Sequence, residues 1–289
     1  MFGRYRPWLR MVLLGFTGLL AGLWAESSAA DVSLRFGIYT SDKPTEMIRK
    51  FGTVLRALET SLEDRLKEPV QIDLKVAKTY DQGVADLVYG EVDFSRLGPA
   101  SYVTAKRGNP GLLLLAMELT NQGKYFYGVI CVREDSPIKS IEDLRGKTFA
   151  FGDQNSTIGR YLAQQYLAKH GVHAEDLSGY EYLGRHDKVG TLVALGRFDA
   201  GALKEGTYLR LVAKGEPLRV LARFRNVSKP WVVHPQVPER VRAALSQVLI
   251  EWKDTEALKA LKKNGFTQTS DDEYEIVRQA MDASQDLGY

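Results

Sequence analysis

A short run of small and polar residues from Gly152 to Gly159, Gly-Asp-Gln-Asn-Ser-Thr-Ile-Gly, carries the strongest chemical signal in the sequence. It follows a strand-like apolar run and precedes a helical pattern. The first N–H groups of such a helix have no partner within the helix, and the helix dipole favours negative charge there. Together with the hydroxyl groups of Ser156 and Thr157, these groups suit an oxyanion. The alternative is that Ser156 or Thr157 only caps the helix.

A second segment, Gly98-Pro99-Ala100-Ser101-Tyr102, opens another predicted helix. Proline is common in the first turn of a helix, and Ser101 lies near the free amides of that turn. We expect this helix to face the first motif across a cleft, so that donors from two parts of the chain converge on one anion. Simple helix capping is the alternative for Ser101.

The elements that position these motifs alternate along the chain. The predicted strands are residues 33–39, 70–77, 94–97, 112–117, 126–132, 149–151, 180–183, 200–203 and 218–224. The predicted helices are residues 45–66, 80–90, 99–107, 141–145, 157–170, 187–196 and 206–214. This alternation favours an α/β protein with mainly parallel sheets, whose ligand lies beyond the carboxyl ends of the strands. Residues 238–253, 255–264 and 270–286 indicate a tail of consecutive helices with no strands between them.

The first thirty residues have the order of a secretory signal peptide. Three arginines precede the apolar run 11–25, and small residues follow it. This apolar run is short for a membrane span. We therefore predict a signal peptide at residues 1–30, cleaved after Ala30, and export to the periplasm. An uncleaved anchor is the alternative, because Trp24 and Glu26 fit poorly near that cleavage site.

Charge and cysteine content exclude some classes of protein. The formal net charge is +3, and removal of the leader, with its three arginines and one glutamate, leaves 36 basic and 35 acidic residues, a charge of +1. The chain has no basic stripe that would follow a nucleic-acid backbone, so we expect no nucleic-acid partner. Cys131 is the single cysteine. An intramolecular disulfide is therefore impossible, and the predicted mature chain must be stabilised by a hydrophobic core.

Five segments together resemble the phosphate-, phosphite- and phosphonate-binding proteins of ABC importers, a branch of the type 2 periplasmic-binding fold. The segments are residues 34–38, residues 90–93 with 98–102, residues 125–130, residues 133–147, and residues 152–159 with 184–187. The resemblance implies a two-lobed α/β protein with a ligand cleft between the lobes and a helical C-terminal tail. The first lobe would comprise residues 31–126 and 225–289, and the second residues 127–224. It implies neither a cofactor nor a metal.

The resemblance also assigns ligand-binding residues. In this family an Asn-Ser-Thr-x-Gly segment supplies hydroxyl and backbone donors to the phosphorus oxyanion, which implies that Ser156, Thr157 and the amides up to Gly159 bind the ligand. The family's histidine falls on His186, for which a surface helix cap is the alternative. A family tyrosine of the first lobe falls on Tyr80.

The remaining family positions are less well defined. A further tyrosine falls on Tyr125 or Tyr127, and core packing is an equal alternative for aromatic residues at a strand start. Family members that bind aminoalkylphosphonates present carboxylates to the ammonium group of the ligand. Glu205 stands at one of these positions, beside Lys204. The alternative is that Glu205 and Lys204 form only a surface ion pair. At the other position the sequence has Lys229 where a carboxylate would be expected. These departures favour a ligand without an amine, such as phosphate, phosphite or a simple alkylphosphonate.

Three functions stay open at this point. The first is that a monomeric periplasmic protein captures a small oxyanion and delivers it to an ABC permease. The second is that the protein binds an oxyanion, arsenite among the possible ligands, and signals this to a membrane histidine kinase as its input subunit. The third is an enzyme with Cys131 as nucleophile, His186 as base and Asp187 as orienting acid. We do not predict catalysis, because an isolated cysteine in an apolar run is usually inert packing.

Overall fold

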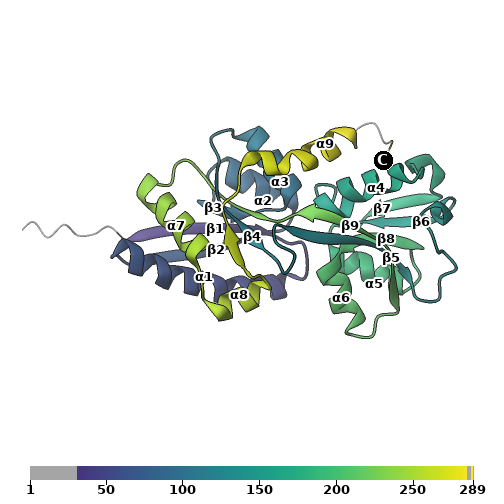
Figure 1. Cartoon of the computed structure of the whole chain (residues 1–289), viewed down its shortest axis with the longest axis horizontal. Coiled ribbons are helices and arrows are strands. Elements are labelled where there is room, and N and C mark those ends of the chain that lie inside the picture. The colour runs from purple at the N-terminus through teal and green to yellow at the C-terminus, as the bar shows by residue number, and fades with distance from the viewer. Residues whose placement is uncertain (1–30, 285–287, 289) are drawn as a thin grey trace, which may run out of the picture. The chain divides into compact units, whose positions relative to one another are not determined.

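The computed structural model describes residues 31–284 and residue 288. These residues form two β-sheets with helices packed on them (Figure 1). We call the six-stranded sheet with its helices the first lobe, and the five-stranded sheet with its helices the second lobe. The predicted signal peptide, residues 1–30, lies outside the described residues. Within the part of the chain that is described, no helix has the length and apolar character needed to cross a membrane.

The first lobe is built around a mixed sheet. Its strands, in spatial order, are β11 (Gly265–Thr267), β4 (Leu113–Leu119), β10 (Pro230–Val233), β3 (Phe94–Arg96), β1 (Val32–Tyr39) and β2 (Val70–Ala77). β1 pairs in parallel with β2 and β3. β10 is antiparallel to both β3 and β4, and β11 is antiparallel to β4.

Helices pack on both faces of the first sheet (Figure 1). They are α1 (Pro44–Leu66), α2 (Tyr80–Val88), α3 (Pro99–Gly108), α7 (Glu239–Glu251) and α8 (Thr255–Leu261). The C-terminal helix α9 (Glu275–Ala283) packs beside α3. α1 is amphipathic and buries Leu58 and Leu62, which lie four residues apart on one face. α1, α7 and α8 share a core with the sheet, in which the ring of Phe36 lies 4.8 Å from Phe94 and 4.9 Å from Trp231. α2, α3 and α9 contribute to a separate core cluster.

The second lobe has a five-stranded sheet. Its strands, in spatial order, are β7 (Gly179–Tyr182), β6 (Thr148–Phe151), β8 (Ala200–Lys204), β5 (Tyr125–Arg133) and β9 (Leu218–Val227). Its helices are α4 (Leu162–Lys169), α5 (His186–Ala194) and α6 (Glu205–Val212). β6 is parallel to β7 and β8, whereas β5 is antiparallel to β8 and β9. A π-helical turn, Thr157–Tyr161, leads from the loop after β6 into α4.

The two-lobed α/β architecture and the helical C-terminal tail agree with the prediction, but the sheets differ in detail. Among the described strands, antiparallel pairs outnumber parallel pairs, so the expectation of mainly parallel sheets is wrong. β10 is missing from the predicted strands because it begins at Pro230, which cannot donate a ladder hydrogen bond. β11 lies between α8 and α9, where no strand was expected; its three residues are too few to show a pattern.

The chain crosses between the lobes after β4 and again after β9. β5 and β9 pair with each other from Tyr125 opposite Val227 onward, so the predicted boundaries at 126/127 and 224/225 fall inside these two strands. The two connections lie side by side, because the N–H of Ser228 donates to the carbonyl of Lys124 at 2.8 Å.

A buried carboxylate ties the centre of the first sheet together. Glu118 of β4 is fully buried. It accepts hydrogen bonds from Arg96 Nη2 at 2.8 Å and Trp231 Nε1 at 3.2 Å, and Lys263 Nζ lies 3.2 Å away. Burial alone would raise the pKa of Glu118, but Arg96 and Lys263 outweigh it and hold this pKa well below its usual range.

We predict that Glu118→Gln lowers the free energy of unfolding by about 3 kcal/mol, because it leaves two buried cations without a counter-charge. Urea unfolding followed by circular dichroism measures this change. The control is Asp282→Asn, which breaks an exposed ion pair with Arg107 and should cost less than about 1 kcal/mol. Equal effects of the two substitutions would contradict the prediction.

Candidate anion-binding site

A small cavity between the two lobes is lined by four of the nine predicted site residues, Tyr80, Ser156, Thr157 and His186. Its volume is about 20 Å³, little more than one water molecule needs. The lining residues are Tyr39, Tyr80, Gly98, Pro99, Phe126, Ser156, Thr157, Ile158, His186, Lys204, Asn226 and Lys229. Several of these residues stand at the carboxyl ends of strands or at helix starts, where open α/β sheets bind their ligands.

Ser156 and Thr157 both use their side-chain oxygens as acceptors. Ser156 Oγ accepts from the N–H of Gly159 at 2.9 Å and so caps the π-helical turn. Thr157 Oγ1 accepts from the N–H of Ala100 at 2.8 Å and thereby joins the second lobe to the start of α3. Each hydroxyl still has its own hydrogen to donate. Helix capping and donation to an anion are therefore compatible.

Gly159 contributes close packing. A Cβ atom at this position would lie 2.8 Å from the Cα of Gly152, and the N–H of Gly152 donates to the carbonyl of Gly159 at 2.8 Å. Only glycine permits such an approach of two backbone segments. The N–H of Gly159 is taken by Ser156, and Gly159 is not among the residues that line the cavity.

Two buried polar side chains at the cavity have atoms without partners. His186 is 3% exposed and Asn226 is 2% exposed. Among the described residues, neither Nδ1 of His186 nor the two amide atoms of Asn226 has a hydrogen-bond partner. Burial, with Lys204 acting in the same direction, lowers the pKa of His186 well below its usual value, so its ring is neutral. Buried polar atoms without a hydrogen-bond partner lower the stability of the folded protein unless a ligand supplies the missing hydrogen bonds.

Asn226 is absent from the predicted site. Along β9 the side chains of Phe224 and Asn226 are buried, whereas that of Arg225 is exposed. A polar residue in the inward phase of a strand is the signal that would have identified Asn226.

Two tyrosines form the wall contributed by the first lobe. The ring centroids of Tyr39 and Tyr80 lie 3.9 Å apart. The hydroxyl of Tyr39 accepts from the N–H of Gly98 at 2.7 Å and shares a 2.8 Å hydrogen bond with Ser101. Ser101 therefore lies behind Tyr39 and does not itself line the cavity. Burial raises the pKa of Tyr39 to about 12 and that of Tyr80 well above its usual value, so both hydroxyls are neutral donors.

Two lysines also reach the cavity. Lys229 is 9% exposed, and its Nζ lies 5.9 Å from the ring centroid of Phe126. Burial lowers the pKa of Lys229 well below its usual value, and the neighbouring cations Arg96 and Lys204 lower it further. An arriving anion would reverse this effect, because an opposite charge stabilises the ammonium form.

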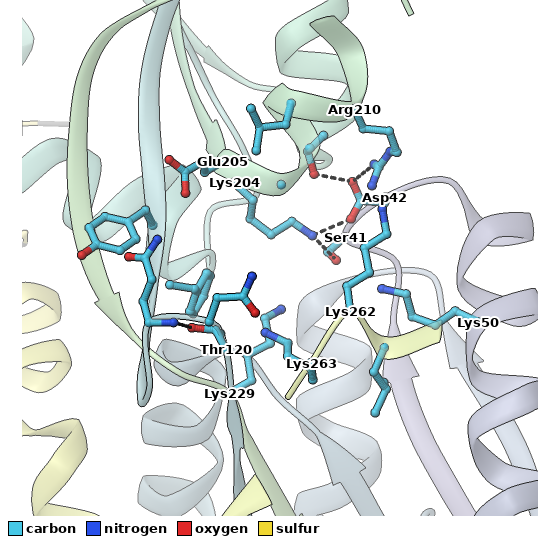
Figure 2. A pocket seen from close by; sticks show the side chains of 18 of the residues that line it. Ser41, Asp42, Lys50, Thr120, Lys204, Glu205, Arg210, Lys229, Lys262 and Lys263 are labelled. Carbon is cyan, nitrogen blue, oxygen red and sulfur yellow. Dashed lines mark hydrogen bonds and ion pairs between the residues drawn. The ribbon is translucent and has the colours of Figure 1, made fainter. Parts of the chain in front are cut away.

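Lys204 takes part in a second connection between the lobes (Figure 2). Asp42, in the loop after β1, is 7% exposed. Its carboxylate accepts from Lys204 Nζ at 2.5 Å, from Thr207 Oγ1 at 3.0 Å and from Arg210 Nη2 at 3.0 Å. Burial opposes ionisation of Asp42, yet Lys204 and the other cations hold its pKa well below the usual range. This cluster links the loop after β1 to the second lobe beside the cavity.

Besides Ser101 and Gly159, three further predicted residues lie outside the small cavity. Tyr125, Tyr127 and Glu205 line a larger neighbouring pocket, and Phe126, between the two tyrosines, is the residue of this strand that reaches the small cavity. The guanidinium of Arg223 lies over the ring of Tyr127 and donates to Glu205 at 2.6 Å. Glu205 is therefore already paired.

Cys131 is fully buried in β5, and burial raises the pKa of its thiol to about 12. A thiol in that state is a poor nucleophile. Within residues 31–284 and 288, no three His, Cys, Asp or Glu side chains are grouped so that they could hold a metal ion.

Known proteins resemble this chain in sequence and in fold. The family model for the ABC transporter, phosphonate, periplasmic substrate-binding protein matches residues 36–274. The probable ABC transporter phosphite binding protein PhnD1 of Prochlorococcus marinus (strain MIT 9301) is 32% identical over 180 residues, which make up 60% of this chain and 58% of that protein. The phosphonates-binding periplasmic protein of Escherichia coli (strain K12) is 25% identical over 157 residues, 53% of this chain and 45% of that protein.

The chain thus spans about half the length of these two relatives in sequence. The likeness of fold extends further. The structure of PhnD1 from Prochlorococcus marinus (MIT 9301) in complex with methylphosphonate has a TM-score of 0.76 at 20% identity, and the match covers 88% of this chain and 98% of that one. Because the family model covers most of the sequence, the chain belongs to the phosphonate-type periplasmic substrate-binding proteins of ABC transporters.

Proposed function

We propose that this protein binds a small phosphorus oxyanion in the cavity between its lobes and delivers it to the membrane permease of an ABC importer. One observation carries the proposal: buried polar atoms of His186 and Asn226 lack partners in a cavity that hydroxyl groups and Lys229 also line. A phosphorus oxyanion would satisfy these donors at once. The family of the chain, and the methylphosphonate bound to its structural relative, support the same class of ligand.

Each lining residue has a distinct role in this proposal. Ser156 and Thr157 donate their hydroxyl hydrogens to oxyanion oxygens, and His186 and Asn226 donate from their N–H groups. Tyr80 donates from the first lobe. Ser101 and Gly159 act indirectly, the former through the hydroxyl of Tyr39 and the latter by allowing close packing of the motif.

The charges at the cavity select against an amine. Lys204 and Lys229 line it, and the carboxylate of Glu205 lies in the larger pocket, where it pairs with Arg223. The phosphorus oxyanion therefore bears no ammonium group, as in phosphate, phosphite and alkylphosphonates. Tyr125 and Tyr127 belong to the larger pocket and contact only what extends beyond the phosphorus group.

The output of binding is transport from the periplasm. Family members are substrate-binding proteins of importers, and the buried thiol of Cys131 gives no support for catalysis. A membrane sensor kinase is the alternative receiver of the closed form. Uptake of radiolabelled ligand into cells with and without the gene separates the two outputs, because a sensing protein leaves the uptake rate unchanged when the permease is expressed independently.

Isothermal titration calorimetry tests the proposed ligand class. The purified protein, unfolded and refolded to remove bound anions, is titrated with phosphite, phosphate, methylphosphonate, 2-aminoethylphosphonate and sulfate. We expect at least one of the first three to bind more tightly than 2-aminoethylphosphonate and sulfate. Absence of binding to all three would refute the proposal.

The substitution Asn226→Leu should weaken ligand binding without destabilising the ligand-free protein. We predict that it weakens ligand binding by about 1–3 kcal/mol, while the free energy of unfolding of the ligand-free protein stays the same or rises by about 1 kcal/mol, because an unsatisfied buried amide is removed. Calorimetry and urea unfolding measure the two quantities. The control is Asn109→Leu, since Asn109 Nδ2 donates to the carbonyl of Val88 and its Oδ1 accepts from Gly111. Asn109→Leu should lower the free energy of unfolding and keep the ligand affinity. If Asn226→Leu kept the ligand affinity and Asn109→Leu lost it, the proposed site would be contradicted.

Substitutions of Thr157 test whether ligand binding requires its hydroxyl group. Thr157→Val keeps the shape of the side chain but removes its O–H donor and its hydrogen bond to Ala100. We predict a loss of affinity of about 1–3 kcal/mol in calorimetry. Thr157→Ser keeps the hydroxyl and should retain most of the affinity. Unchanged affinity of the valine variant would remove Thr157 from the site.

A further inference from the structure

The small cavity adjoins a much larger pocket that the proposed function does not use. This pocket has a volume of about 410 Å³ and shares Phe126, Lys204 and Lys229 with the small cavity. A ligand whose phosphorus group fills the small cavity therefore has space for a substituent on this side. The side chains that line this pocket determine which substituent it can bind.

The larger pocket is strongly cationic. Two carboxylates line it, those of Asp42 and Glu205. Seven cationic side chains line it, those of Lys50, Arg96, Lys204, Arg210, Lys229, Lys262 and Lys263. Figure 2 shows Glu205 across the pocket from Lys50, Lys262 and Lys263.

Some of these cations are neutralised by the protein. Arg96 and Lys263 pair with the buried carboxylate of Glu118. Lys204 and Arg210 pair with Asp42. These four side chains need no ligand.

Three lysines are not neutralised. Among residues 31–284 and 288, the ammonium groups of Lys50, Lys229 and Lys262 make neither a hydrogen bond nor an ion pair. Lys229 is also nine-tenths buried. Burial, followed by the charges of Arg96 and Lys204, lowers the pKa of Lys50 to about 7. Lysines that line one pocket without counter-charges repel one another, and an anion between them would relieve the repulsion.

We propose that the ligand of this protein carries a second anionic group, which enters the larger pocket and binds Lys50, Lys229 and Lys262 while the phosphorus group occupies the small cavity. The substrate class is then a phosphonate whose short substituent ends in a carboxylate or a second phosphoryl group. This inference rests on the proposed function, because it takes the small cavity as the site of the first phosphorus group.

A cationic or purely apolar substituent fits the pocket less well. The unpaired lysines would repel an ammonium group, and the carboxylate of Glu205 is already engaged by Arg223. Apolar and aromatic side chains also line the pocket, those of Met47, Tyr125, Phe126, Tyr127, Leu209 and Leu261. An alkyl chain alone would leave the three ammonium groups without a counter-charge.

Matched ligands test the second anionic group. By calorimetry at constant pH and salt, 3-phosphonopropionate and methylenediphosphonate are compared with propylphosphonate, which lacks the second charge, and with 2-aminoethylphosphonate. We expect at least one of the doubly anionic ligands to bind about tenfold or more tightly than propylphosphonate, and 2-aminoethylphosphonate to bind more weakly than either. Equal affinity of propylphosphonate and both doubly anionic ligands would overturn the inference.

Variants locate the effect in the larger pocket. Lys50→Gln and Lys262→Gln lie outside the small cavity, so each should reduce the advantage of the doubly anionic ligand about threefold or more and leave the affinity for propylphosphonate unchanged. Lys214→Gln, at an exposed lysine after α6, is the control and should change neither affinity. Melting temperatures verify that each variant is folded. Equal loss for both ligands in the pocket variants would also overturn the inference.

The proposed function and this inference fail in different ways. If propylphosphonate, methylphosphonate, phosphite and phosphate all fail to bind, the small cavity is not a phosphorus-oxyanion site and both proposals fall. If propylphosphonate binds and neither doubly anionic ligand binds more tightly, only the assignment of the larger pocket falls.

Discussion

The site depends on the energetic cost of enclosing polar atoms without partners. In the closed arrangement, Nδ1 of His186 and the amide of Asn226 are removed from water and have no protein partner among the described residues. Such groups destabilise a closed cleft unless something fills it. An oxyanion supplies several acceptor oxygens at once, so binding and closure of the lobes favour each other. Neutral donors suffice for this purpose, and the nearby lysines add charge.

The topology explains why these donors meet. β1 and β3 of the first sheet and β6 and β8 of the second direct their carboxyl ends toward one cavity, and a loop or helix start follows each of them. The contacts that hold this arrangement from opposite lobes include the hydrogen bond from the amide of Ala100 to Thr157 and those from Lys204, Thr207 and Arg210 to Asp42. The two chain segments that join the sheets, before β5 and after β9, lie side by side.

Local patterns in the sequence predict only part of this site. Ser156 and Thr157 follow a strand and begin a helix, so a strand, loop and helix pattern identifies them, whereas His186 and Tyr80 are assigned from the family resemblance. The structure brings all four to one cavity. Asn226 lies near the end of β9, where the pairing of β9 with β5 decides which side chains face the cavity. That pairing is a long-range property, and a shift of one residue would reverse the faces.

The same reasoning explains why Tyr125 and Tyr127 line the larger pocket and not the small cavity. Side chains alternate between the two faces of a strand, so Tyr125 and Tyr127 share one face of β5 and Phe126 lies on the other. The side chain of β5 that reaches the small cavity is therefore that of Phe126, and neither tyrosine does so. The two strands absent from the prediction, β10 and β11, are short and are held by pairing with β4, not by a pattern of their own.

A crystal structure of the protein grown with methylphosphonate tests the central claim most directly. Our account predicts phosphonate oxygens within hydrogen-bonding distance of the Asn226 amide, the His186 ring and the hydroxyls of Ser156 and Thr157. A methylphosphonate bound elsewhere, with water alone beside Asn226 and His186, would contradict it.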